Sequence, residues 1–228
     1  MKVLYEDNHI IIVNKEAGEI VQGDKTGDTP MTEKVKEWIK VKYNKPGNVY
    51  LGLAHRLDRP TSGAIVFAKT SKALSRLNDL FRKDDVKKTY WAIVQNPPKP
   101  EVGSLRHYLW KNEKQNKSYA FADNKQQKEA KLALLEYKMI ARSDNYFLLA
   151  VDLETGRHHQ IRCQLASIGC PIKGDLKYGA KRSNPDGSIS LHARSLSFIH
   201  PVSKEMIDVV APVPEDNLWQ ALENSVER

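Results

Sequence analysis

The sequence has 228 residues, of which 40% are hydrophobic and 28% charged, a composition typical of a globular protein with a sizeable core. Lysine and arginine total 36 against 28 acidic residues, and the net charge of +8 favours a polyanionic partner, either nucleic acid or an anionic membrane surface. No run approaches the roughly 18 apolar residues of a membrane helix, the N-terminus lacks a signal-peptide layout, and the two cysteines form no C-x-x-C pair. We therefore expect an intracellular, cytoplasmic protein with reduced thiols.

The N-terminal third combines short strands with two helices. Asp7 and Asn8 form a turn dipeptide between two β-rich runs. Thr29 followed by Pro30 is typical of a helix start, with threonine as the cap and proline at the first helical position. Ser71 is the expected cap of a second helix, whose leucines follow helical spacing. The predicted strands are residues 3–6, 10–14, 49–54 and 64–68, and the predicted helices are residues 30–43 and 71–82.

The rest of the chain is richer in strands. A proline-rich interruption at residues 97–100 is followed by a polar segment over residues 104–123, which predicts a hairpin. Because many predicted strands follow one another without a helix, we expect an α+β fold with a mixed, mainly antiparallel sheet and flanking helices. The further predicted strands are residues 90–94, 132–140, 146–153, 189–199 and 206–210, and the further predicted helices are residues 158–168 and 217–226.

The polar turn between two hydrophobic strands, residues 54–63, concentrates groups that can do chemistry. It holds a histidine, two arginines and the carboxylate of Asp58, followed by two hydroxyl residues. Arginines beside a carboxylate favour its ionised form, and an ionised carboxylate can act as a nucleophile, a general base or an electrostatic partner. The alternative is an Asx-turn, in which Asp58 and Ser62 bond backbone amides and the arginines face solvent. Spacing alone leaves both interpretations open.

A second segment, residues 154–165, begins with a Thr-Gly turn and continues into a predicted helix. Free amides at a helix start attract anions, and Arg157 adds a guanidinium suited to phosphate. On a helix, His158, Arg162 and Leu165 lie at positions i, i+4 and i+7 and share one face. The alternative is that the apolar residues of this helix form core while the basic residues are surface groups, and one helix can do both.

Metal and nucleotide sites are not predicted. His158 and His159 point in different directions if they lie on a helix, and the sequence has no H-x-x-x-H, H-E-x-x-H or C-x-x-C spacing. The sequence also lacks a Walker motif and a G-x-S-x-G elbow, and its H-R-L-D run differs in order from the kinase H-R-D-L. We therefore expect no metal, and neither nucleotide nor serine hydrolysis.

Five motifs in order resemble the RluA-type family of pseudouridine synthases. They are H-R-L-D at residues 55–58, K-T-Y at 88–90, G-R-H-H-Q-I-R at 156–162, the G-D and Y-G pairs within 174–179, and L-H-A leading to H-P within 191–201. Each motif alone is weak, but the set spans nearly the whole chain. The sequence departs from the family in its early N-K-P-A-G motif, because glutamate stands at position 16 in place of proline.

The resemblance implies an isomerase that converts uridine to pseudouridine in structured ribosomal or transfer RNA. It implies one catalytic domain over residues 1–228, without the S4 RNA-binding domain that many members carry. Asp58 would be the essential carboxylate, acting as a nucleophile or by removing a sugar proton. Tyr90 would stack under the base, and Arg162 would pair with Asp58 and keep it ionised. The reaction changes no redox state, so no cofactor is implied.

The same resemblance implies how RNA is held. Arg56 would fill the space of the flipped uridine or hold the flipped strand, and Leu165 is expected mainly to pack, with a second role against the base. The full set of expected substrate-binding residues is His55, Arg56, Arg59, Thr61, Arg157, Lys15 and Leu165, of which Lys15, Arg59 and Arg157 would hold phosphates. We expect a monomer with no protein partner and no membrane contact.

Two other functions compete with this one. The first is a catalytically silent RNA-binding module of the same fold, which would lack one of the three catalytic residues, whereas all three are present. The second is a basic structural or interaction protein whose charge only keeps it in solution. That protein would not carry the motifs in order.

Overall fold

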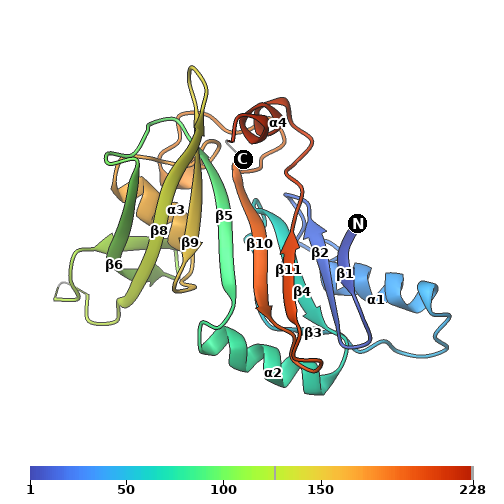
Figure 1. Ribbon diagram of the computed structural model, residues 1–228. Coiled ribbons are helices and arrows are strands. Elements are labelled where there is room, and N and C mark those ends of the chain that lie inside the picture. The colour runs from blue at the N-terminus through green and yellow to red at the C-terminus, as the bar shows by residue number, and fades with distance from the viewer. Residues whose placement is uncertain (126, 227–228) are drawn as a thin grey trace. The chain divides into compact units, whose positions relative to one another are not determined.

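The computed structural model describes residues 1–125 and 127–226, and its chain forms two compact units (Figure 1). The first unit contains Met1–Val86 and Ser195–Pro212, and the second contains Lys87–Arg194 and the residues from Val213 onward. Each unit is therefore assembled from two separate stretches of chain. The expectation that residues 1–228 form a single catalytic domain stays a prediction.

The first unit combines short antiparallel strands with two helices. Its strand order is β1-β2-β4-β10, with β3 paired to β4 and β11 paired to β10, and every register described here is antiparallel. Its elements are β1 Lys2–Glu6, β2 Ile10–Lys15, α1 Met31–Lys42, β3 Gly52–Leu53, β4 Ser62–Ala68, α2 Ser71–Arg82, the end of β10 Leu191–Ile199, and β11 Met206–Val210. Only β3 is much shorter than its predicted strand.

Alternate residues of the strands build the core of the first unit. Ile10 and Ile12 of β2 pack with Val66 of β4 and with Leu77 of α2, and all four are fully buried. Phe198, which reaches this core from the far end of the sequence, is also buried. The core that carries the turn at residues 54–63 thus depends on both stretches of chain.

Both helices of the first unit begin one step away from the predicted cap. Pro30 is the N-cap of α1, in extended conformation and without a capping side chain, whereas Thr29 was the expected cap. The first amides of α1 instead donate to the carbonyls of Ile20 and Val21. In α2 the cap is Thr70, whose hydroxyl accepts from the amide of Ala73, and not Ser71.

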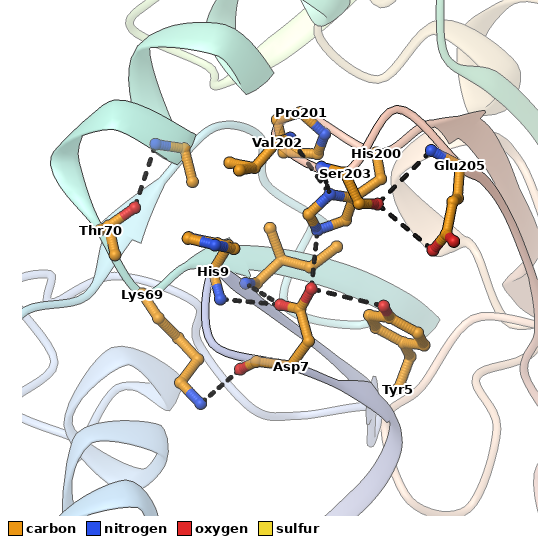
Figure 2. A network of polar contacts seen from close by, with 12 residues as sticks. Tyr5, Asp7, His9, Lys69, Thr70, His200, Pro201, Val202, Ser203 and Glu205 are labelled. Atoms are coloured by element: carbon orange, nitrogen blue, oxygen red, sulfur yellow. Dashed lines mark hydrogen bonds and ion pairs between the residues drawn. The ribbon is translucent and has the colours of Figure 1, made fainter.

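A polar cluster joins the turn before β2 to the turn after β10 (Figure 2). Asp7 accepts hydrogen bonds from the amides of His9 and Ile10 at 2.7 and 2.8 Å. Its other carboxylate oxygen lies 2.9 Å from Nε2 of His200. Nδ1 of His200 accepts from the amides of Val202 and Ser203 at 3.1 and 2.8 Å. Nδ1 of His200 thus holds the turn at residues 200–203, and Nε2 lies against the carboxylate of Asp7.

The second unit is an antiparallel sheet with the strand order β5-β9-β8-β6-β7. The polar segment predicted as a hairpin is the hairpin of β6 and β7, as expected. The elements are β5 Lys87–Val94, β6 Val102–Asn112, β7 Lys117–Phe121, β8 Lys131–Arg142, β9 Phe147–Leu153, α3 Gln160–Ser167, a 3-10 turn Leu176–Tyr178, the start of β10, and α4 Asn217–Asn224. The predicted α+β fold with mainly antiparallel strands is confirmed.

Each face of the second sheet is covered by a different helix. Leu135 and Leu149 pack with Leu165 of α3 on one face. Ile93 packs with Trp219 of α4 on the other. This division follows from the two-residue period of the strands. Within the described residues, no helix is both long and apolar enough to cross a membrane.

Candidate active site

The turn that carries Asp58 lies between β3 and β4 in the first unit. The amide of Thr61 donates to the carbonyl of Asp58 at 3.0 Å, which closes a tight turn. The amide of Gly18 donates to the carbonyl of Arg59 at 2.8 Å and attaches the turn to the loop after β2. Asp58 itself is half-buried. The backbone of the turn is thus fixed on both sides of its carboxylate.

Lys15, at the end of β2, supports this turn from beneath. Its side chain is buried, with 1% of the residue exposed. Its ammonium donates to the carbonyls of Glu16, Arg59 and Thr61 at 3.0, 3.0 and 2.6 Å. An ammonium has three N–H donors, so all of them are used. The expectation that Lys15 holds a phosphate is therefore wrong, because the group is enclosed and saturated by backbone oxygens. Lys15 contacts residue 16 through its backbone carbonyl, which glutamate and proline both have. The glutamate that replaces the proline of the family motif therefore leaves this hydrogen bond possible.

Lys15 also sets the electrostatics of the turn. Burial lowers the pKa of Lys15 to about 8, while the negative charges of Glu19 and Asp58 raise it. With a pKa of about 8 the ammonium is mostly protonated at pH 7. A positive charge therefore lies within electrostatic range of the Asp58 carboxylate in the first unit.

The two arginines of the turn are exposed. Arg59 forms an ion pair with Asp28 at 2.5 Å, and both side chains are about half exposed. Such a pair contributes little to stability, and a phosphate can compete for the guanidinium. Arg56 is exposed as well. The expected RNA contacts of Arg56 and Arg59 stay predictions.

His55 and Thr61 are placed inside the turn rather than on its surface. Nε2 of His55 accepts from the amide of Val66 at 3.1 Å, and its ring stacks on Phe81 with centroids 4.4 Å apart. These contacts make His55 a support of the turn. Thr61 is 2% exposed, and its hydroxyl is buried without a hydrogen-bond partner among the described residues. Substrate contacts of both residues stay predictions.

The start of α3, in the second unit, differs from the expected geometry. The helix begins at Gln160, and His159 is its N-cap in the left-handed region at φ 52°. His158 therefore lies outside the helix and does not share a helical face with Arg162 and Leu165. The left-handed turn also brings the rings of His158 and His159 into a stack with centroids 3.8 Å apart. The expectation that they point in different directions is wrong, because it assumed helical backbone at both.

Arg162 is held by a carboxylate that the sequence analysis did not assign. Its Nε and Nη2 donate to the two carboxylate oxygens of Asp175 at 2.7 and 2.9 Å, and both side chains are buried. The ring of Tyr178 lies 5.2 Å from the guanidinium carbon. Asp175 and Tyr178 belong to the G-D and Y-G motif pairs, so the sequence marks both residues but does not indicate that they contact Arg162. The bidentate contact uses two of the five N–H groups of the arginine.

Tyr178 connects this pair to the β6–β7 hairpin. Its hydroxyl accepts from the amide of Ser118 at 2.8 Å and lies 2.9 Å from Nδ1 of His159. Burial raises the pKa of Tyr178 well above its ordinary value, so the phenol stays protonated at neutral pH. A protonated hydroxyl can accept from the amide and donate to the imidazole at once.

The remaining expected residues of the second unit have different surroundings. Tyr90, on β5, is half-buried and packs against the core that α3 covers. Leu165 is fully buried in that core, so the packing alternative is the one that the structure supports. Arg157 is exposed, and its Nε donates to the carbonyl of Leu132 at 2.9 Å. Asp58 belongs to the first unit, and its expected pairing with Arg162 stays a prediction.

The described residues contain no group of three or more histidine, cysteine or acidic side chains arranged to hold a metal ion. Cys163 and Cys170 are both free thiols and both buried. Burial raises the pKa of Cys163 to about 12, which keeps it as an unreactive thiol.

Comparisons with known proteins agree on one family. A family model described as RNA pseudouridylate synthase matches residues 9–167. An uncharacterized RNA pseudouridine synthase of Synechocystis sp. is 34% identical over 94% of the chain and 66% of its own length. The ribosomal large subunit pseudouridine synthase D of Zymomonas mobilis is 31% identical over 95% of the chain and 70% of its own length. The chain thus spans about two thirds of the length of these curated relatives.

A solved structure shows the same fold. Human RNA pseudouridylate synthase domain containing 4 aligns with a TM-score of 0.79 at 23% identity, covering 100% of this chain and 94% of the human one.

Proposed function

The chain belongs to the RNA pseudouridylate synthase family, whose members are isomerases that act on RNA, and on this basis we propose that it converts uridine to pseudouridine in a folded RNA. Asp58 is the catalytic carboxylate in this proposal, Tyr90 stacks under the base, and Arg162 pairs with Asp58. One observation carries it. The turn that matches the family's H-R-L-D motif is fixed by the three hydrogen bonds of Lys15, whose charge attracts the Asp58 carboxylate.

The reaction exchanges one bond to the sugar for another. The bond between C1′ and N1 of uracil breaks, the base turns, and a bond between C1′ and C5 forms. The hydrogen of C5 is lost to solvent and N1 gains one, so atoms balance without an oxidant or a cofactor. Asp58 assists the first step either by attacking C1′ or by removing the proton on C2′. Both routes require a carboxylate held in place, and the hydrogen bonds of Lys15 fix the backbone of the turn that carries it.

The proposed substrate is ribosomal or transfer RNA. A pseudouridine synthase named for the ribosomal large subunit is among the relatives, which favours the ribosomal alternative. A uridine that is stacked or paired must be flipped out before its sugar can be reached, at a cost of a few kcal/mol. The exposed Arg56, beside Asp58, is the residue we assign to the vacated space. We further propose that the protein acts as a monomer in the cytoplasm, as the sequence analysis expects.

Pseudouridine mapping tests the proposal. Total RNA from cells lacking the protein is compared with RNA from cells complemented by the wild type or by Asp58→Asn, which keeps the shape of the side chain. We expect one or a few uridines to lose the modification and only the wild type to restore it. In vitro, the wild type should release tritium from RNA labelled at C5 of uridine, because the reaction removes that hydrogen.

The outcomes separate an enzyme from a silent RNA-binding module. If no site changes, or if Asp58→Asn restores every site, the assigned chemistry is wrong and the silent module becomes the better account. If Asp58→Asn binds RNA as well as the wild type but releases no tritium, the carboxylate acts in catalysis and not in binding.

A further inference from the structure

The β6–β7 hairpin carries four aromatic side chains on one face. Residues directly opposite in an antiparallel pair lie on the same face. Tyr108 lies opposite Phe121, and Trp110 lies opposite Tyr119. The rings of Trp110 and Tyr119 are in contact range, with centroids 6.3 Å apart. Two neighbouring strands thus present two successive pairs of rings on the same side.

This face is not the one that packs on α3. Leu105 and Leu109 alternate with Tyr108 and Trp110 along β6, and both leucines are buried. Leu109 packs in a cluster with Cys163 of α3. The aromatic side chains therefore point away from α3, and all four are half-buried. Partly accessible aromatic residues clustered on a sheet face are a feature of binding surfaces.

Cations lie among the rings. Nζ of Lys117 lies between two rings, 5.5 Å from the centroid of Tyr119 and 5.3 Å from that of Tyr178. The guanidinium carbon of Arg106 lies 5.6 Å from the centroid of the Tyr108 ring. Within residues 106–121 the charged side chains are Arg106, Lys111, Glu113, Lys114 and Lys117, one acid against four bases. The hairpin therefore favours a partner that has both flat rings and negative charge.

We propose that this aromatic face, formed by Tyr108, Trp110, Tyr119 and Phe121 with Arg106 and Lys117, stacks unpaired bases of a single-stranded RNA segment. Aromatic rings stack on any base, and neighbouring cations attract the phosphates that join successive bases. The proposal rests on the proposed function, because it makes this segment part of the substrate RNA, outside the uridine that reacts. An apolar protein partner would not use the excess of positive charge, so RNA is the occupant that the charges favour.

Two substitutions at Trp110 test stacking separately from hydrophobic contact. Trp110→Phe keeps an aromatic ring, and Trp110→Leu keeps an apolar side chain without one. Binding of the full chain to a single-stranded oligouridylate is measured by fluorescence anisotropy. We expect Trp110→Leu to weaken binding about tenfold and Trp110→Phe to stay close to the wild type. On the substrate RNA, Trp110→Leu should raise KM and leave kcat unchanged.

A matched control and a second variant make the test sharp. Trp38→Leu replaces another half-exposed tryptophan, on α1 in the first unit, and should not change oligouridylate binding. Lys117→Ala should reduce the slope of log affinity against log salt by about 0.7, the value of one phosphate contact to a single strand. Lys117 is half-buried and its substitution removes no core side chain, so it remains informative if Trp110→Leu fails to fold.

The outcomes distinguish this proposal from the proposed function. If Trp110→Leu and Lys117→Ala bind oligouridylate as the wild type does, the aromatic face is not an RNA surface, whether or not the chain modifies uridine. If both weaken binding while the wild type releases no tritium from any RNA, the face binds RNA and the proposed chemistry is wrong. Equal weakening by Trp110→Phe and Trp110→Leu would also contradict stacking.

Discussion

Lys15 is a charged residue whose role differs from the one that its sequence context predicts. In the sequence it follows an asparagine and precedes a glutamate, and nothing local distinguishes it from the many surface lysines. In the structure its ammonium is enclosed by three carbonyls. A charge is expensive to bury unless hydrogen bonds replace its water, and these three bonds do so. The residue therefore shapes the turn around Asp58 instead of contacting a ligand.

Replacement of Lys15 tests this role. Lys15→Met removes a donor from three carbonyls, of which that of Arg59 keeps the amide of Gly18. We expect a loss of about 2 kcal/mol in the free energy of unfolding, since each buried acceptor left unsatisfied costs on the order of 1 kcal/mol or more. Activity should fall as well, because the turn around Asp58 loosens. Thermal unfolding and tritium release measure the two effects.

The matched control is Lys34→Met, which removes an exposed lysine paired with Glu19. We expect that change to stay within about 0.5 kcal/mol of the wild type. Similar stabilities for the two variants would show that the buried hydrogen bonds of Lys15 contribute nothing.

At the scale of elements, hydrophobic periodicity located the strands and helices but not their ends. The α2 helix was predicted over the right residues, yet its cap is one residue earlier than expected. Thr70 and Ser71 both carry hydroxyls, and only the backbone conformation decides which of them reaches the amide of Ala73. His159 was misplaced for a related reason, because sequence spacing assumes helical backbone and a left-handed residue interrupts it.

The two candidate caps give a direct comparison. Thr70→Ala removes the side chain that accepts from Ala73, and we expect it to cost about 1 kcal/mol. Ser71→Ala should change stability by a few tenths of a kcal/mol, because its hydroxyl is not the cap. Chemical denaturation of both variants measures the difference, and an equal loss would put the cap at the wrong residue.

The ring of His200 joins two turns and makes their contact sensitive to pH (Figure 2). Burial lowers its pKa, while the charge of Asp7 opposes that shift. The folded chain therefore keeps the ring neutral where the unfolded chain, with a pKa of about 6.5, binds a proton. Its contribution to stability is complete above pH 6.5 and is lost as the pH falls through the lowered folded pKa.

We expect His200→Phe to be less stable than the wild type at pH 7.5, because the amides of Val202 and Ser203 lose their acceptor. The gap between the two proteins should narrow between pH 7 and 5. Urea denaturation over this range measures it. A difference in the free energy of unfolding that stays constant or widens as the pH falls would mean that the folded state does not favour the neutral form of His200.

At the scale of the whole molecule, ordered motifs identified the family and the fold class, but they did not reveal the division of the chain. Each unit contains two separate stretches of chain, and no change in composition marks the boundary at Ser195. Partners such as Asp175 were also missed, because a contact between residues far apart in sequence leaves no spacing pattern. The aromatic face likewise depends on the register of β6 and β7, which places the rings side by side and is not encoded in residue spacing.

The net charge of +8 predicts how RNA binding responds to salt. Each phosphate that the protein neutralises adds about 0.7 to 0.9 to the slope of log affinity against log salt. We expect affinity for the substrate RNA to fall at least tenfold between about 50 and 200 mM salt. A tenfold loss over this range corresponds to about two phosphate contacts. Filter binding across this range measures the slope, and a flat response would show that the charge excess lies away from the RNA.

The assembly of the first unit from two distant stretches of chain has a consequence for folding during translation. The core of the first unit needs Phe198 and Val209, which are synthesised long after Val86. At the usual rate of about 5–20 residues per second, the nascent N-terminal segment waits on the order of 10 s for its missing strands. During that time the apolar side of β2 and β4 has α2 to pack against, but it lacks the side chains of β10 and β11 that complete the core. Folding of this unit is therefore completed only late in translation.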